Sequence, residues 1–182
     1  MTSSQFLQGV AEPVQIVVAG EQEIPQLVAL ARETFYATWS PVNTDEDLAI
    51  FMDEAFHPEK VRKEIGQPAV FTFLLVRSGN ELAGYAKLRR DTVFESLPDV
   101  SPLEIEKFYF LKKFFGTGLS DQLMRSVLSI AEKEGKEWVC LGVDVNNHRA
   151  ARFYERYGFE KFGSKSFRVG NQVDTDNLMK RK

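Results

Sequence analysis

Two segments in the second half of the chain carry residue types that bind phosphate groups and move protons. The first is the loop Phe115-Gly116-Thr117-Gly118-Leu119-Ser120, which stands between an apolar run and a helical pattern. Glycine adopts backbone conformations closed to other residues, and the start of a helix offers unpaired N–H groups and the positive end of its dipole. Such a loop can bind a pyrophosphate, although a Gly-x-Gly pair on its own is more often a plain turn.

The residues around these glycines exclude two familiar phosphate-binding loops. A P-loop requires Lys and then Ser or Thr after its last glycine, whereas Leu119 and Ser120 follow Gly118 here. The dinucleotide fingerprint requires a third glycine early in a βαβ unit, whereas this loop is followed by Asp121 and lies past the middle of the chain. A phosphate site here must therefore be of another class.

The second segment places an amide, a phenol and a terminating glycine on one predicted helix. Its spacing is Asn-x-x-Ala-x-x-Phe-Tyr-x-x-x-Gly-Phe, with Asn147, Ala150, Phe153, Tyr154, Gly158 and Phe159 at the fixed positions. Together with the glycine loop upstream, this pattern resembles the GNAT acetyltransferase superfamily. Residues 103–110 are similar to the fourth strand of that family, and the resemblance covers residues 14–181.

The resemblance implies a GNAT fold of the α+β class (a mixed α/β sheet), with a mostly antiparallel central sheet of about seven strands and helices on both faces. It implies transfer of an acetyl group from acetyl-CoA, as co-substrate and without a metal, to a primary amine of a small molecule. Residues 43–47, 103–106, 141–143 and 170–176 more narrowly resemble the bacterial PaiA-type spermidine/spermine N-acetyltransferases. A polyamine such as spermidine or spermine is then the implied acceptor.

The family resemblance also implies where acetyl-CoA binds. The strand edge at Phe108, Tyr109 and Phe110 pairs with the pantetheine arm, and an N–H there polarises the thioester carbonyl. Asn147 hydrogen-bonds the same arm. The pyrophosphate is bound by Phe115, Gly116, Thr117, Gly118, Leu119 and Ser120. Lys112 and Lys113 are further candidates for phosphate contacts, with a solvated pair as the simpler alternative.

Acetyl transfer to an amine needs a base for the amine and an acid for the departing thiolate. The resemblance makes Tyr154 the general acid, with a core tyrosine as the alternative role. Glu104 is the first candidate for the base, acting through water, and Glu106 is the second because period-two spacing places both on one strand face. A solvated strand residue is the alternative role for each glutamate, and an N-cap is the alternative role for Asn147.

The glycine loop departs from the family pattern at two positions. Phe115 stands where Gln or Arg is usual, and Ser120 stands where Gly or Ala is usual. Asp121 also puts an anion into the first helical turn, beside the expected phosphates. These departures leave open a non-catalytic acyl-CoA-binding regulatory module. A protein or peptide amine, or another small amine, remains an alternative acceptor.

Composition narrows the class of protein. The net charge of −3 and the lack of a basic run argue against nucleic acid as a partner. A single cysteine, Cys140, excludes an intrachain disulfide, and two histidines, His57 and His148, leave little material for a metal site. No stretch approaches the ~20 apolar residues that span a bilayer, and the N-terminus lacks a secretory pattern. We therefore expect a cytoplasmic protein with no membrane partner, and a homodimer is common in the family.

Hydrophobic periodicity predicts the order β-α-α-α-β-β-β-α-β-α-β-β. Predicted strands cover residues 14–19, 69–76, 82–89, 103–111 and 138–145, with two more around a turn at 170–171. Five helices are predicted. The first begins at residue 23, the second after an N-cap at Asn43 or Thr44, the third at 58, the fourth after 114–118 and the fifth at 149. Gly158 is the predicted C′ glycine of the fifth helix. We expect one GNAT domain over residues 1–182, with a flexible N-terminus over 1–12. The acidic residues of 45–54 could attract a cationic substrate, and the loop 90–102 could wall its pocket.

Overall fold

The computed structural model describes residues 13–97, 100–169 and 172–182. The expected flexible N-terminus over residues 1–12 and the expected turn at 170–171 lie outside these ranges. The helices are α1 (Ile24–Trp39), α2 (Asp45–Ala55), α3 (Pro58–Ile65), α4 (Leu119–Lys133) and α5 (His148–Arg156), with short 3-10 helices η1 (Glu21–Glu23) and η2 (Lys112–Phe114). The strands are β1 (Val14–Val18), β2 (Phe71–Ser78), β3 (Glu81–Arg89), β4 (Leu103–Phe110), β5 (Val139–Asp144), β6 (Glu160–Val169) and β7 (Gln172–Arg181).

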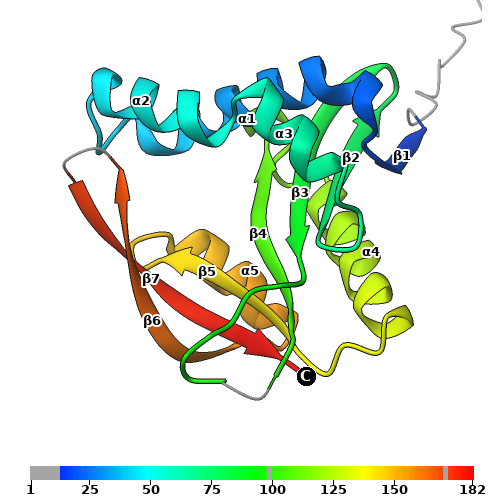
Figure 1. Ribbon diagram of the computed structural model, residues 1–182, viewed down its shortest axis with the longest axis vertical. Helices are drawn as coiled ribbons and strands as arrows, with labels where there is room; N and C mark the ends of the chain where they lie inside the picture. Colours follow the sequence, from blue (N-terminus) through cyan, green and yellow to red (C-terminus); the bar gives the residue numbers. More distant parts are fainter. Residues whose placement is uncertain (1–12, 98–99, 170–171) are drawn as a thin grey trace, which may run out of the picture.

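The strands form a seven-stranded sheet in the order β1-β2-β3-β4-β5-β7-β6 (Figure 1). Every neighbouring pair is antiparallel except β4 and β5, which are parallel. These two central strands pair only where Leu103, Glu104 and Ile105 lie opposite Val139, Cys140 and Leu141. Beyond that point β5, β7 and β6 turn away from β4 in Figure 1. The structure thus confirms the predicted mixed sheet and adds a split between its central strands.

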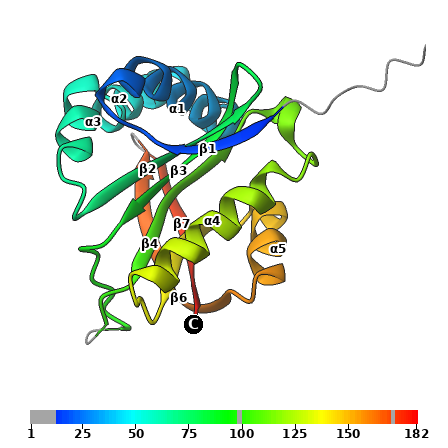
Figure 2. The ribbon, with the colours of Figure 1, turned by 90° about the vertical axis from the view of Figure 1, so that its right-hand side faces the viewer.

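Helices cover both faces of the sheet (Figure 2). On one face, Phe73, Leu75 and Tyr85 pack into the core formed with α1, α2 and α3. On the other, Leu74 and Val76 pack into the core formed with α4 and α5. Because β2 is buried on both faces, its sequence is an unbroken apolar run and not an alternation.

Local sequence signals set the ends of the helices. Thr44, not Asn43, is the N-cap of α2, because its hydroxyl accepts the Asp47 N–H at 3.1 Å. Gly158 has a φ of 79° and is the C′ residue of α5, as predicted. The N–H of Gly158 donates to the Glu155 carbonyl at 2.9 Å, and the N–H of Phe159 donates to Tyr154 at 3.2 Å. These two bonds form a Schellman motif.

One strand begins and ends two residues later than predicted, since β2 spans Phe71–Ser78 and not residues 69–76. The carbonyl of Gln67 accepts the N–H groups of Val70 and Phe71, both at 2.9 Å, so a turn occupies the start of the apolar run. Hydrophobic pattern alone cannot distinguish a buried turn from the first residues of a buried strand.

Candidate active site

The split sheet leaves one edge of β4 open. Past Ile105, β4 has a paired strand only on its β3 side among the described residues. The Leu111 N–H donates to the Ala83 carbonyl at 2.9 Å, so alternation turns the backbone groups of Phe108 and Phe110 to the open side. An open strand edge can pair with an extended ligand arm.

Tyr109 differs from its two predicted partners. Alternation directs its backbone toward β3, and its ring packs with the α1 core, 5.9 Å from the Tyr85 ring centroid. Its hydroxyl accepts the indole N–H of Trp39 at 3.4 Å, and burial raises the pKa of that hydroxyl to about 12. Of the three residues predicted at this edge, Phe108 and Phe110 therefore present their N–H groups to it.

A cavity of about 390 Å³ lies beside the open edge. Its walls come from β4, the first two helices, the first turns of α5, and the strands β5, β6 and β7. The predicted catalytic residues Glu104, Glu106 and Tyr154 all line it, as does Asn147. The fold thus brings together residues that are far apart in sequence.

Tyr154 and Asn147 lie on one face of α5, at a spacing of seven residues. Tyr154 is 7% exposed and its ring contacts Phe108, Phe153 and Phe159. It is therefore a core tyrosine that also lines the cavity. Burial raises the pKa of its hydroxyl well above the ordinary value, so the proton stays on the phenol at neutral pH.

Asn147 is the N-cap of α5, because its Oδ1 accepts the Ala150 N–H at 3.1 Å. This confirms one of the two roles considered for it. The cap occupies only the amide oxygen, so the Nδ2 donors remain available toward the cavity.

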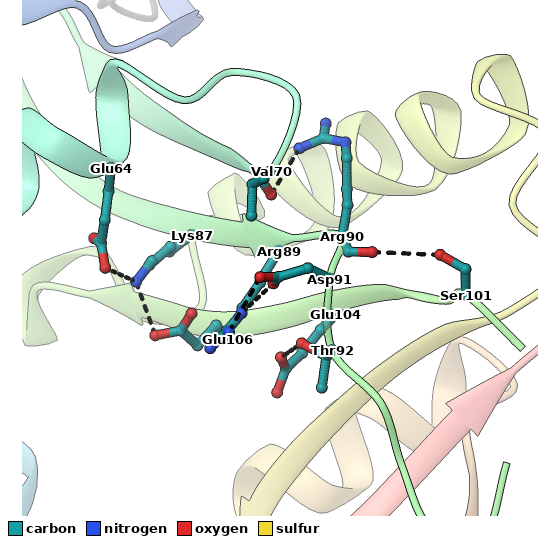
Figure 3. A network of polar contacts seen from close by, with 10 residues as sticks. All are labelled: Glu64, Val70, Lys87, Arg89, Arg90, Asp91, Thr92, Ser101, Glu104 and Glu106. Carbon is teal, nitrogen blue, oxygen red and sulfur yellow. Dashed lines mark hydrogen bonds and ion pairs between the residues drawn. The ribbon is translucent and has the colours of Figure 1, made fainter. Parts of the chain in front are cut away.

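Glu104 and Glu106 share the cavity face of β4, as their spacing predicted. Glu104 accepts a hydrogen bond from the Thr92 hydroxyl, and burial is the main cause of a raised pKa for its carboxyl group (Figure 3). Glu106 Oε1 accepts from Lys87 Nζ at 2.9 Å, and the same ammonium donates to Glu64 at 2.8 Å. Glu106 Oε2 is buried and accepts no hydrogen bond within the described chain. Neither glutamate is a freely solvated strand residue.

Two cavity carboxylates, Asp144 and Asp176, were missed by the sequence reasoning. Gly142 makes room for Asp176, since a Cβ at Gly142 would lie 2.7 Å from Asp176 Oδ2. Burial first, and then the nearby Asp144, raise the pKa of Asp176 to about 6. The β5–β7 pairing places Asp176 directly opposite Asp144, a contact between strands that are far apart in sequence.

The glycine loop has the backbone geometry expected of an anion site. Gly116 and Gly118 have φ angles of 77° and 82°, a region that favours glycine, and Gly118 is the N-cap of α4. Among the described residues, no acceptor bonds the N–H groups of Gly116, Gly118, Leu119, Ser120 and Asp121. Five free donors at a helix N-terminus suit a pyrophosphate.

The departures from the family pattern in this loop have structural counterparts on α5. Phe115 is 41% exposed, and the Arg149 guanidinium carbon lies 3.7 Å from the centroid of its ring. A cation therefore stands beside the loop although residue 115 is not basic. Asp121 Oδ1 accepts from the Tyr157 hydroxyl at 2.8 Å and lies 3.7 Å from Arg156, so its charge is directed toward α5.

Other predicted contributors lie away from the cavity. Lys113 pairs with Glu81 on β3, and Lys112 is exposed on η2. The acidic start of α2 does not line the cavity, and Asp45 there accepts from the Tyr36 hydroxyl at 2.8 Å. Attraction of a cationic substrate by this acidic helix therefore stays a prediction, with an ordinary helix N-terminus as the alternative. The loop 90–102 contributes Thr92 to its wall.

Two features are absent from residues 13–97, 100–169 and 172–182. No helix there is long and apolar enough to cross a membrane. No group of three or more His, Cys, Asp or Glu side chains there is placed to hold a metal ion.

Comparisons with known proteins agree with this geometry. Residues 24–159 match the Acetyltransferase (GNAT) family. An uncharacterised N-acetyltransferase from the pepI 3′ region of Lactobacillus delbrueckii subsp. lactis is 36% identical over 172 residues, which cover 92% of this chain and 96% of the relative. An uncharacterised N-acetyltransferase of Mycobacterium tuberculosis is 33% identical over 156 residues, covering 86% of this chain and 95% of the relative.

Solved structures share the fold at low sequence identity. The PaiA N-acetyltransferase of Thermoplasma acidophilum, solved in complex with coenzyme A, superposes with a TM-score of 0.75 at 19% identity. The match covers 93% of this chain and 99% of that one. A GCN5-related N-acetyltransferase of Rhodopseudomonas palustris gives a TM-score of 0.73 at 12% identity, over 94% of this chain and 97% of that one.

Proposed function

The chain belongs to the GNAT acetyltransferase family and is an N-acetyltransferase that uses acetyl-CoA, and we propose that its acceptor is a primary amine of a small molecule bound beside β4. The observation that carries this proposal is the cavity of about 390 Å³, which joins the open edge of β4 to Tyr154 and four carboxylates. Those carboxylates are Glu104, Glu106, Asp144 and Asp176.

In the proposed complex the pantetheine arm extends along the open edge of β4. The N–H of Phe108 or Phe110 then donates to the thioester oxygen and stabilises the negative charge that develops there. The donors of the glycine loop bind the pyrophosphate, and Arg149 adds a positive charge next to it. Asn147 offers its amide N–H groups to the pantetheine.

The acceptor attacks as a free amine, because an ammonium with a pKa near 10 has no lone pair. Its nitrogen forms a bond to the thioester carbon, and the carbon–sulfur bond of the tetrahedral intermediate then breaks. Tyr154 donates its proton to the departing sulfur. Burial disfavours the thiolate as it does the phenolate, so the two effects offset each other in the proton transfer.

Three carboxylates are positioned to take the proton of the amine, directly or through water. Glu104 and Glu106 were the predicted bases, and Asp176 joins them on geometry. Glu106 is held by Lys87, which lowers its freedom to accept a proton from the substrate. Asp176, whose carboxyl pKa is raised to about 6, is better matched to base catalysis near neutral pH.

Two acceptor classes fit this chemistry. A polyamine such as spermidine or spermine is favoured by the carboxylates of the cavity. An amine that also carries an anion is favoured by Lys107, Lys165 and Arg168, which line the same cavity. Both classes share the reacting group and differ in what must bind the remainder of the molecule.

Release of free CoA from acetyl-CoA tests the proposal with a panel of amines. The panel holds spermidine, spermine, putrescine, lysine, a peptide with a free N-terminus and an aminoglycoside. We expect turnover with at least one small amine and none with the peptide. Turnover with the peptide alone would move the acceptor to a protein amine and contradict the proposal.

A further inference from the structure

A second cavity, of about 300 Å³, adjoins the first. It lies under α1, α2 and α3, against β3 and β4. The two cavities share Phe51, Glu106, Lys107 and Arg168 as wall residues. A molecule that reaches the open edge of β4 from the first cavity can therefore extend into the second.

Lys107 is placed on this shared wall by an irregularity in the sheet. The β3–β4 register pairs Lys87 with Lys107 and then Leu88 with Ile105, so Glu106 has no partner on β3. This bulge brings Glu106 and Lys107, which are consecutive, to the walls of both cavities.

The second cavity holds more positive than negative charge once its internal ion pairs are removed. Lys87 is 6% exposed and donates to both Glu64 and Glu106, so its charge is compensated and this cluster keeps one net negative charge. Lys60, Lys107 and Arg168 form no ion pair within the described parts of the chain. Glu54 is the acid of this wall that also lacks one. The unpaired cations therefore exceed the unpaired acids.

Lys107 is the least exposed of these three cations. It is partly buried, its Nζ lies 5.9 Å from the Phe51 ring centroid, and burial lowers the pKa of its ammonium. A buried ammonium without a counter-ion is costly, and an anion bound beside it would offset that cost. Glu106, Asp176 and Glu104 favour the ammonium from a distance, but none of them lies within ion-pair distance of Lys107 in the described structure.

The acids of the first cavity lie toward the other end. Asp144 and Asp176 come from β5 and β7, and Glu104 lies at the start of β4. Lys165 lies opposite Asp176 in the β6–β7 register and acts to lower the pKa of that carboxyl, so it offsets part of the acidic charge at this end. Charge is thus sorted along the joined cavities, with carboxylates near β5 and β7 and unpaired cations beneath α2 and α3.

We propose that the second cavity is a subsite for an anionic group of the acceptor, bound by Lys107 with help from Arg168 and Lys60. The acceptor is then an amine that also carries a carboxylate or phosphate, as in an amino acid, and a plain polyamine is the poorer substrate. The proposal rests on the N-acetyltransferase function proposed above. The ammonium or amine end lies at Glu104, Glu106 Oε2 and Asp176, where base catalysis takes place.

Matched pairs of acceptors test the subsite without any mutation. Lysine and cadaverine differ only by a carboxylate, as do ornithine and putrescine, and O-phosphoethanolamine and ethanolamine differ by a phosphate. The measured quantity is kcat/KM for each amine at saturating acetyl-CoA, with spermidine included. We expect at least about a tenfold preference for the anionic member of one pair, and the preferred pair identifies carboxylate or phosphate.

The variant Lys107→Met assigns that preference to the subsite. We expect this variant to raise KM for the anionic acceptor of a pair about tenfold. KM for the matched amine that lacks the carboxylate or phosphate should stay unchanged. Lys133→Met, on the exposed last turn of α4, is the matched control and should behave as wild type. Far-UV circular dichroism checks that both variants fold.

The outcomes separate the two proposals. Equal kcat/KM within every pair, or a preference for spermidine and the diamines, would overturn the anionic subsite and leave a small-amine acetyltransferase. Equal losses for both members of a pair in Lys107→Met would overturn the role of Lys107. No turnover with any small amine would overturn the proposed acceptor class as well.

Discussion

At the residue scale, burial separates the proton affinities of the groups around the cavity. The pKa of the Tyr154 hydroxyl is raised well above its ordinary value, so it remains an acid throughout the neutral range. The pKa of Asp176 is raised only to about 6, so its carboxylate is ionised at pH 7 yet basic enough to accept a proton. Two groups with separated pKa values can then divide the acid and base roles of one reaction.

Replacing Tyr154 by Phe removes the proposed acid and keeps the ring that packs against Phe108 and Phe159. We expect kcat to fall about 100-fold or more, because a positioned acid contributes about that much, while the Kd for acetyl-CoA changes little. Steady-state kinetics and calorimetric titration measure the two quantities. Tyr36→Phe, which removes an exposed tyrosine hydroxyl outside the cavity, is the control. Equal loss of turnover and affinity would refute the general-acid role.

Asp176→Asn tests the base. In the wild type, kcat should rise with pH below about 6 and then level off, since the carboxylate must lose its proton to act. In the variant that inflection should disappear and kcat should fall about 100-fold at pH 7. The same pH profile in Glu104→Gln distinguishes the two candidates. An inflection that survives in Asp176→Asn and vanishes in Glu104→Gln would assign the base to Glu104.

Asp176→Asn should lower kcat but raise the free energy of unfolding at neutral pH. Because the pKa of Asp176 is higher in the folded state, its contribution to stability is full below the unfolded pKa of 3.8 and is lost as pH rises through about 6. Asp176→Asn should therefore raise the free energy of unfolding at pH 7 by about 1–2 kcal/mol, the partial exposure of the side chain reducing the effect. The gain should vanish near pH 4. Urea denaturation at both pH values measures it, and a loss of stability at pH 7 would contradict it.

The sequence was sufficient for some of these residues and not for others. Glu104, Glu106, Asn147 and Tyr154 were found because each belongs to a local pattern on one strand or helix. Asp176 and Lys107 were missed because their placement depends on non-local pairing. Asp176 needs the β5–β7 register that pairs it with Asp144 and brings its side chain over Gly142, and Lys107 needs the bulge at Glu106. Neither the register nor the bulge has a signature in the residues themselves.

At the scale of elements, the proposed phosphate site draws on two helices and not on one loop. The N-terminus of α4 supplies the free N–H groups, and the first turn of α5 supplies Arg149. The packing of these helices is fixed by the hydrogen bond from the Tyr157 hydroxyl to Asp121. Phe115 carries no positive charge where the family pattern has Gln or Arg. Its exposed ring instead packs against the guanidinium of Arg149, which brings a positive charge to the same place.

Arg149→Ala tests this arrangement. We expect KM for acetyl-CoA to rise about tenfold with little change in kcat, because the contact is to a charged group away from the reacting atoms. The difference from wild type should shrink as salt screens an exposed contact. Arg152→Ala, an exposed arginine on the same helix, is the control. An unchanged KM for acetyl-CoA in Arg149→Ala would exclude a phosphate contact by this residue.

Element order and type were predictable because hydrophobic periodicity and caps are local properties. The caps Thr44 and Gly158 both occupy predicted positions. The split between β4 and β5 was not predictable from periodicity, because charged and apolar residues occur both where the strands pair and where they diverge. The split removes the ladder hydrogen bonds on one side of residues 106–110. The same split leaves the strand edge at which we propose that the pantetheine binds.

At the scale of the whole molecule, one sheet links two cores that enclose different parts of the site. Strand β4 contributes Ile105 to the core under α4 and α5, and Tyr109 to the core under α1, α2 and α3. Strand β2 likewise contributes to both. Because β2 and β4 belong to both cores, neither core can unfold without exposing the other. We therefore predict that the part of the chain described by the structure unfolds as one cooperative domain.

Single-tryptophan variants test that prediction, since the two tryptophans report on different regions. Trp39 packs with the core under the first helices, and Trp138 packs with Phe94 and Cys140 at the other end of the sheet. Trp39→Phe and Trp138→Phe should give one urea transition each, with fluorescence and circular dichroism midpoints that coincide within a variant. Fluorescence and circular dichroism midpoints that differ within one variant would reveal two folding units.

Acetyl-CoA should stabilise this cooperative unit as a whole, because its proposed site spans β4, α4 and α5, all tied to the core under α4 and α5. At 100 times its Kd, a ligand that binds only the folded state adds about 2.7 kcal/mol to the free energy of unfolding. For a chain of this size that corresponds to a rise in Tm of about 5–10 °C. The rise should be the same whether Trp39 or Trp138 reports it, because both regions unfold together. A rise seen by one reporter alone would mean that the ligand stabilises only part of the chain, and it would contradict both the single domain and the linkage of the two cores through β4.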